Sequence, residues 1–339
     1  MERPDKILLT LTKVMVATIA LTVFVVIALA WVMWFEPQSS NTSTPNLAVN
    51  VAPAKPIIDY WQAPAISSIA EEEKELVLYG RDLIANTAHF LGPKGIVAQM
   101  SNGMNCQNCH LEAGTKVFGN NYSAVASTYP KLRARSGQQE SIEKRINDCF
   151  ERSLNGDKLP DDSKEMQAMV AYMKWLGTDV QKDDVPIGSG LPELPFLDRP
   201  ADILKGQQVY VTQCVVCHGA NGEGIQAPDG RTYTYPPLWG DNSYNSGAGL
   251  FRMSRFAGYV KANMPLGATI DFPMLSDEQA WDVAAYVNSQ VRPEKDLTGD
   301  WPDISKKPID HPFGPFSDDF TEIQHKYGPF KPIVEARKK

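Results

Sequence analysis

The residues best suited to chemistry are two copies of Cys-x-x-Cys-His, "CQNCH" at 106–110 and "CVVCH" at 214–218. In this motif the two thiols form thioethers with haem vinyl groups, and the adjacent histidine ligates the iron. A zinc site would need more ligands at short spacing, and a thioredoxin-like pair would need a strand–helix–strand context. We therefore predict two covalently bound c-type haems, attached through Cys106, Cys109, Cys214 and Cys217 and ligated by His110 and His218.

Each iron has a second axial position, and for the second haem the stretch "VKANMPLG" offers Met264 before a proline. A methionine in such a loop is a common sixth ligand, and Met/His ligation raises the reduction potential. Met253 and Met274 are competitors, and all three methionines could instead fill the core. Lys261 could reach the same area, although a solvated surface lysine is its simpler reading. We predict Met264 as the ligand.

The first haem has no comparable Met-Pro, and the fifth cysteine, Cys149 in "RINDCFERS", lies in the corresponding interval. On a helix, Arg145, Cys149 and Ser153 fall at i, i+4 and i+8 and share one face. A buried free cysteine would normally share its face with apolar residues, so this pattern favours a polar site in which Cys149 is the distal ligand. Arg133 and Arg135 add positive charge nearby, which indicates either an anion site or a solvated basic face.

Four helical stretches are predicted to position these residues, and they form an internal repeat. In each copy one helix precedes the haem motif and another ends the copy; the four lie at 71–88 and 162–176, then 201–213 and 275–290. Gly80 and Gly206 are candidate equivalent close-packing positions, and Ser276 with Gln279 predicts a capping box. No strand-period run is long enough to build a sheet, so the pattern favours an all-α fold.

The N-terminal part differs in composition from the rest of this 339-residue chain. The uncharged apolar run 14–35 predicts a transmembrane helix anchoring the protein to the inner membrane, with the remainder in the periplasm. The alternative is a signal peptide cleaved near "ALA" at 28–30, which would leave a soluble periplasmic protein. The net charge of −7 argues against a nucleic-acid partner but leaves room for a small anionic substrate.

Taken together, "CQNCH", "YPKLRARSG", "RINDCFERSLNG" and the tail at 304–333 resemble the dihaem thiosulfate dehydrogenases, which interconvert thiosulfate and tetrathionate. The resemblance covers roughly residues 60 to 335. It implies two class-I cytochrome c domains in tandem, with thiosulfate oxidised at the first haem. Cys149 would match the family's distal cysteine, and Arg135, Arg145 and Ser153 the residues lining that site. His218 and Met264 would ligate a second haem that passes electrons to a soluble cytochrome or another acceptor.

This interpretation divides the chain into six parts. They are an anchor or signal peptide at 1–35, a linker at 36–56, the catalytic haem domain at 57–183, an interdomain linker at 184–200, the electron-transfer haem domain at 201–295 and a tail packing on the domains at 296–339. One alternative is a membrane-tethered dihaem electron carrier without a substrate of its own. Another is a sulfur carrier that holds its cargo on Cys149. His89, His311 and His325 are expected to be structural or surface residues.

Overall fold

The computed structural model describes residues 4–34 and 58–338 and divides the chain into two units, Met1–Ile57 and Ile58–Lys339. The first contains helix α1, Pro4–Trp34, and the predicted linker at 36–56 lies outside the described residues. Among the described residues, no helix combines the length and the apolar character needed to cross a bilayer. The predicted transmembrane helix at 14–35 is therefore not supported.

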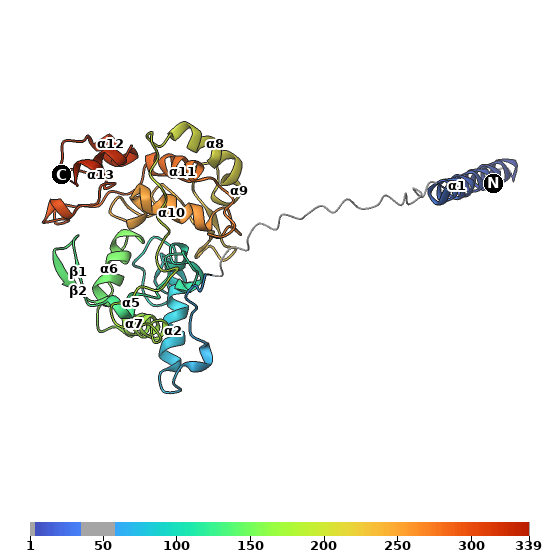
Figure 1. The fold of residues 1–339 in the computed structure, drawn as a ribbon. Helices are drawn as coiled ribbons and strands as arrows, with labels where there is room; N and C mark the ends of the chain where they lie inside the picture. The colour runs from blue at the N-terminus through green and yellow to red at the C-terminus, as the bar shows by residue number, and fades with distance from the viewer. Residues whose placement is uncertain (1–3, 35–57, 339) are drawn as a thin grey trace, which may run out of the picture. The chain divides into compact units, whose positions relative to one another are not determined.

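The second unit is mostly helical, as the sequence predicted, and its elements follow the expected repeat (Figure 1). The first half contains α2 (Lys74–Ala85), α3 (Thr87–Leu91), α4 (Leu111–Gly114), α5 (Val125–Thr128), α6 (Ile142–Arg152) and α7 (Lys164–Leu176). The second contains α8 (Ile203–Gln213), α9 (Val215–His218), α10 (Met253–Asn263), α11 (Asp277–Ser289), α12 (Glu322–Tyr327) and α13 (Lys331–Ala336). Short 3₁₀ turns occur at Ile66–Ser68, Cys106–Asn108, Gly249–Phe251 and Ile304–Lys306.

Each half is built on one helix pair, α2 with α7 and α8 with α11. A Cβ at Gly80 would lie 1.9 Å from the Ala168 carbonyl oxygen, and one at Gly206 would lie 1.9 Å from that of Asp282. Only glycine permits backbones to approach so closely, so the predicted equivalence of Gly80 and Gly206 is confirmed.

Capping side chains fix where the helices begin. Ser276 and Gln279 form the predicted capping box, with Ser276 N–H donating to Gln279 Oε1 at 2.9 Å and Gln279 N–H to Ser276 Oγ at 3.1 Å. Ser141 accepts from Lys144 N–H at the start of α6, the helix that carries Cys149. Each cap satisfies a backbone donor that the first helical turn leaves unpaired.

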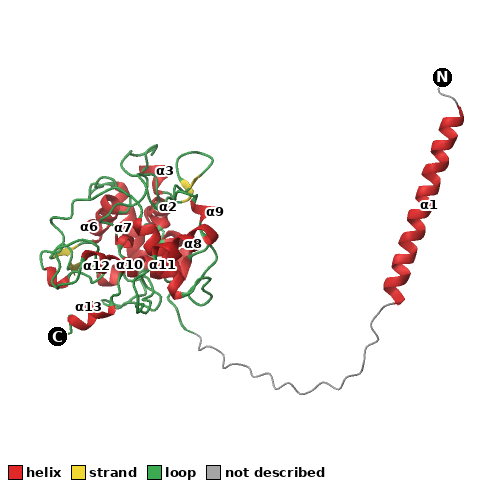
Figure 2. Cartoon of the chain, turned by 90° about the horizontal axis from the view of Figure 1, so that it is seen from above, coloured by secondary structure: helices red, strands yellow, loops and turns green. Residues whose placement is uncertain are grey.

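Two short antiparallel ribbons interrupt the helical fold, and the sequence analysis missed both (Figure 2). Strand β1 (Lys131–Arg133) pairs with β2 (Gln138–Glu140), and β3 (Ile225–Gln226) pairs with β4 (Tyr233–Tyr235). Strands of two or three residues are too short to show an alternating pattern. The β1–β2 ribbon is nevertheless important, because it presents Arg133 and Arg135.

Two separate hydrophobic cores support the two halves, one running from Ile69 to Leu176 and the other from Leu191 to Ile333. The tail belongs to the second core, since Phe330 and Ile333 are buried in it. The halves are also joined directly. Tyr259 Oη donates to the Asn108 carbonyl at 2.7 Å, and Asn263 Nδ2 donates to that of Phe118 at 2.9 Å.

Candidate active site

The histidines of the two motifs have matching surroundings. His110 Nδ1 lies 2.6 Å from the Asn120 carbonyl oxygen, and His218 Nδ1 lies 2.9 Å from that of Pro236. A carbonyl can only accept, so each Nδ1 carries the proton and each Nε2 keeps its lone pair. Burial lowers the pKa of His110 to about 4 and also lowers that of His218, so both rings are neutral at pH 7. Neutral, oriented imidazoles are the form that ligates metals.

A cavity of about 150 Å³ adjoins the first motif and brings most of the predicted first-site residues together. Cys106, Cys109 and His110 line it on one side, and Cys149 from α6 lines it as well. The remaining wall is largely apolar, with Ile84, Val125, Met169 and Met173 among its members. Two motif thiols, an oriented imidazole, a further thiol from Cys149 and an apolar wall fit a covalently held haem.

The second motif adjoins a cavity of about 310 Å³ lined by Cys214, Cys217, His218 and Met264. Its lining contains one carboxylate, Glu112, and no lysine or arginine, and tyrosines and aliphatic side chains make up most of the rest. This cavity too fits a haem held by two thiols, a histidine and a methionine. Because Cys109 lines both cavities, the two haem sites lie side by side.

The structure separates Met264 from its competitors for the second iron. Met253 is buried in the core at 1% exposure, and Met274 is 56% exposed; neither lines the cavity. Lys261 Nζ is engaged by Asp277 at 2.7 Å and by the Leu275 carbonyl at 2.8 Å. Met264 therefore remains the predicted sixth ligand.

Next to the first haem cavity lies a polar chamber of about 260 Å³, in which Cys149 and Ser153 meet five arginines. Three of these are residues singled out from the sequence, Arg133, Arg135 and Arg145, and two come from the second half of the molecule, Arg252 and Arg255. No aspartate or glutamate lines the chamber. A concentration of guanidinium groups without acidic partners in its lining is suited to oxyanions.

The electrostatics of the chamber centre on Cys149. The negative charge of Cys149 is the main reason why the pKa of Arg145 is raised, which outweighs the effect of burial. Within the described residues, the Arg145 side chain has no hydrogen bond or ion pair to a carboxylate. Burial, with Arg152 and Arg145 nearby, lowers the pKa of Arg135 to about 10, which still leaves it charged at pH 7. Both guanidinium groups are thus charged donors in the chamber.

Successive parts of the C-terminal tail contact two of these arginines, Arg135 and Arg252, and also the nearby Arg152. Asp300 accepts two hydrogen bonds from Arg152, at 2.7 and 2.8 Å. The backbone N–H of Trp301 donates to the Arg135 carbonyl at 2.6 Å. The guanidinium of Arg135 lies 5.8 Å from the centre of the Trp301 indole ring. Asp310, only 1% exposed, accepts from Arg252 at 2.6 and 2.9 Å.

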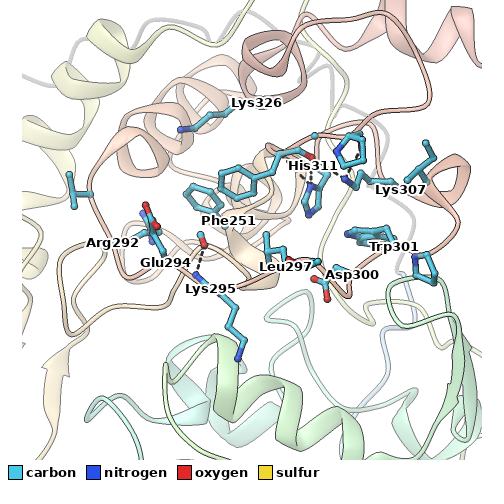
Figure 3. A pocket seen from close by; sticks show the side chains of 18 of the residues that line it. Phe251, Arg292, Glu294, Lys295, Leu297, Asp300, Trp301, Lys307, His311 and Lys326 are labelled. Atoms are coloured by element: carbon cyan, nitrogen blue, oxygen red, sulfur yellow. Dashed lines mark hydrogen bonds between the residues drawn. The ribbon is translucent and has the colours of Figure 1, made fainter.

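A separate cavity of about 820 Å³ lies beneath the tail, and none of the predicted site residues lines it (Figure 3). Lys307 at its edge donates to the carbonyls of Phe313 and Pro315, and His311 packs edge-on against Trp301. His325 is fully buried between the Ile309 carbonyl and Asp318. His311 and His325 therefore have structural surroundings, as expected.

Comparison with known proteins finds two matching cytochrome c segments. Residues 97–181 match the family described as SoxA/TsdA, cytochrome c domain, and residues 203–290 match cytochrome c. Thiosulfate dehydrogenase from Allochromatium vinosum is 37% identical over 81% of this chain and 96% of its own. The enzyme of the same name from Stutzerimonas stutzeri is 39% identical over 69% and 74%.

The chain belongs to the thiosulfate dehydrogenase family. Among solved structures it is similar to thiosulfate dehydrogenase (TsdBA) from Marichromatium purpuratum in the as-isolated form, with a TM-score of 0.63 and 31% identity. That match covers 69% of this chain, which spans half the length of the solved one. With two cytochrome c domains, this thiosulfate dehydrogenase family member carries two covalently bound c-type haems.

The sequence analysis of this thiosulfate dehydrogenase family member missed Arg252, Arg255 and Asp310. The two arginines stand three residues apart in "FRMSRF", at the start of the helix that leads to Met264. Their place in the sequence could have indicated a role, because the helix that leads to Met264 at the second haem site begins beside them and could also reach the first site. Asp310 had no local signal, since its partner Arg252 is distant in sequence.

Proposed function

We propose that this protein oxidises two thiosulfate ions to tetrathionate, with two electrons leaving through its two haems, and that it can run the reverse reaction. The observation that carries the proposal is the chamber around Cys149, lined by five arginines and no carboxylate. Thiosulfate is a dianion, so joining two of them requires positive charge to offset their repulsion. The names of the relatives, thiosulfate dehydrogenase, support the same activity.

Cys149 is the proposed catalytic residue, and Arg135, Arg145 and Ser153 line its site. The Cys149 thiolate forms a sulfur–sulfur bond with the outer sulfur of thiosulfate, giving a Cys–S–S–SO₃⁻ adduct and two electrons. The haems supply the acceptors for these electrons, one each. A second thiosulfate then attacks the same outer sulfur, so that tetrathionate leaves and the Cys149 thiolate is restored. Arg145, one turn before Cys149 on α6 and in the same chamber, gives the incoming anion a guanidinium donor.

The proposed ligand set gives the two haems different tasks. Cys106 and Cys109 would hold the first haem, and His110 and Cys149 would ligate its iron. Cys214 and Cys217 would hold the second haem, and His218 and Met264 would ligate its iron. A thiolate ligand lowers a haem potential whereas methionine raises it, so the second haem would be the better electron acceptor. The shared wall at Cys109 supports direct transfer between them.

The division into a catalytic domain at 57–183, a linker at 184–200, an electron-transfer domain at 201–295 and a tail at 296–339 forms part of the proposal. We place the protein in the periplasm, where c-type cytochromes and their acceptors meet. The proposed acceptor is a soluble cytochrome or another one-electron carrier that docks near the second haem. The net charge of −7 gives no support for a nucleic-acid partner.

The test is turnover by the haem-loaded, full-length protein. Thiosulfate is supplied with an artificial one-electron acceptor, and tetrathionate is quantified for the parent and for Cys149→Ala. We expect tetrathionate from the parent and none above background from the variant. A fully haem-loaded parent that neither forms nor reduces tetrathionate would leave an electron carrier without a substrate, and the proposal would be wrong.

A further inference from the structure

The chamber around Cys149 receives residues from both halves of the molecule. Arg135 comes from the β1–β2 ribbon and Arg145 from α6, whereas Arg252 and Arg255 come from the start of α10. Both haem domains of the chain therefore contribute positive charge to one space. A site for a single dianion would not need five guanidinium groups, since two arginines match its charge and each can engage two of its oxygens.

The reaction itself requires room for two dianions at different stages. The first thiosulfate must approach the thiolate, and Arg145 lies one turn before Cys149 on α6 and lines the same chamber. The second must approach the adduct while a sulfonate already occupies that position. Its own sulfonate group consequently needs a separate set of donors, within the chamber but away from Arg145.

The hydrogen bonds of Arg252 hold its guanidinium in place, as expected of such a donor. Its Nε and Nη2 donate to Asp310 Oδ1 at 2.9 and 2.6 Å. The other oxygen, Oδ2, accepts from Ser254 N–H at 3.0 Å and from Ser254 Oγ at 2.5 Å. Asp310 is buried, and although burial opposes it, Arg252 and Ser254 hold its pKa below the usual range. The carboxylate is thus ionised, and all the contacts of its two oxygens fix the guanidinium. Nη1 of Arg252 has no acceptor among the residues that the structure describes.

Arg255 complements it one helical turn further along α10. Its side chain lines the same chamber, is exposed, and has no hydrogen bond or ion pair to another residue in the described part of the chain. An unpaired arginine next to a fixed one provides both charge and adaptability for an incoming anion.

We propose that Arg252 and Arg255 form a second anion subsite, which binds the thiosulfate that attacks the Cys149 adduct, and that Asp310 is the positioning residue for Arg252. This inference rests on the proposed function. It assigns the first thiosulfate to Arg135 and Arg145 from the catalytic haem domain and the second to arginines from the electron-transfer domain. The tail completes both subsites, because Asp310 binds Arg252 in one and Trp301 lies against Arg135 in the other.

The two half-reactions can be measured separately with the haem-loaded, full-length protein. One equivalent of thiosulfate converts Cys149 to its adduct and reduces both haems, which is followed by haem absorbance and by intact mass. Excess thiosulfate, added next, releases tetrathionate. We expect Arg252→Gln to form the adduct within about threefold of the parent rate, but to need at least about tenfold more thiosulfate for half-maximal release. Arg255→Gln is expected to need about threefold more thiosulfate than the parent for half-maximal release.

Two further variants separate a subsite from a folding defect. Asp310→Asn keeps the guanidinium but loosens it, so it should raise the half-saturating thiosulfate concentration for release and leave adduct formation unchanged. The matched control is Arg199→Gln, since Arg199 donates to buried Asp282 at 2.7 and 2.9 Å in the same way but lies outside the chamber. Both half-reactions of this control should match those of the parent.

A different thiol, 2-mercaptoethanol, tests whether the charge of the second thiosulfate is the reason that the variants release tetrathionate less readily. The thiolate of 2-mercaptoethanol carries one charge and no sulfonate, so it should cleave the adduct of Arg252→Gln as fast as that of the parent. The inference is overturned if Arg252→Gln and Arg255→Gln release tetrathionate with the same thiosulfate dependence as Arg199→Gln. It is also overturned if Arg252→Gln, folded and haem-loaded, fails to form the adduct. Absence of tetrathionate from the parent would instead refute the proposed function.

Discussion

The two haem sites start from the same motif and end in different surroundings. Each has a Cys-x-x-Cys-His stretch, and each histidine is oriented by a backbone carbonyl, at 2.6 Å for His110 and 2.9 Å for His218. Beyond these shared parts, the first site opens on a chamber of arginines around Cys149. The second is enclosed mainly by aromatic and aliphatic side chains around Met264.

This difference shows how a repeated electron-transfer fold can acquire an active site. Attachment and proximal ligation depend on short local stretches, which the two halves share. In the proposed function, substrate chemistry depends on the groups around Cys149, which come from α6, a two-stranded ribbon and the start of α10. A buried, largely uncharged site favours electron transfer, whereas a charged, accessible one favours binding of an anion.

The largest effect should come from removing the sulfur that distinguishes the sites. We expect Cys149→Ala to lose on the order of 10⁴-fold or more in tetrathionate formation, because the nucleophile is absent. The spectrum of the second haem should stay unchanged, which serves as the internal control. Measurable turnover by a fully haem-loaded Cys149→Ala protein would show that the chemistry lies elsewhere.

The second-largest loss of activity should come from removing the positive charge next to Cys149. Arg145→Gln is expected to lower kcat/KM for thiosulfate by about 10²–10³-fold, as for loss of one preorganised donor at a charged reaction centre. Steady-state kinetics with an artificial acceptor measure this value. Arg231→Gln, on the segment between β3 and β4, is the control and should behave as the parent. Equal kinetics for the two variants would remove Arg145 from the site.

The two helix pairs, unlike the two haem sites, should respond alike when the glycine at their contact is replaced. Gly80→Ala and Gly206→Ala each place a Cβ 1.9 Å from a carbonyl oxygen of the partner helix. We expect each to lower the free energy of unfolding by about 1–3 kcal/mol through overpacking. Chemical denaturation of the haem-loaded protein measures both. A large effect in only one half would mean that the helix pairs are not equivalent.

The smallest expected effect concerns the second iron. Met264→Ala should lower the potential of that haem by at least about 60 mV, a tenfold change for a one-electron couple, because methionine ligation favours the reduced state. Redox titration followed by absorbance measures the shift, with Met274→Ala at an exposed position as control. Adduct formation at Cys149 should be little affected. An unchanged potential would assign the ligand to another residue.

Local sequence determined the parts of this protein that depend on short spacing. Two motifs predicted two c-type haems, the glycines at 80 and 206 predicted the helix contacts, and Ser276 with Gln279 predicted a cap. The face shared by Arg145, Cys149 and Ser153 could also be predicted, because helical periodicity fixes it and all three line one chamber. The prediction of a transmembrane helix at 14–35 was not supported.

Only the tertiary structure decided which distant residues complete the active site. Arg252 and Arg255 were signalled only by their place at the start of the helix that leads to Met264, and Asp310 carries no local pattern that relates it to Cys149. An ion pair or a cavity wall depends on chain closure and leaves no periodic trace. The ribbon that carries Arg133 and Arg135 was missed because its strands are only three residues long. Periodicity and motif spacing act over a few turns of chain, whereas the positive field around Cys149 arises when two domains and a tail pack together.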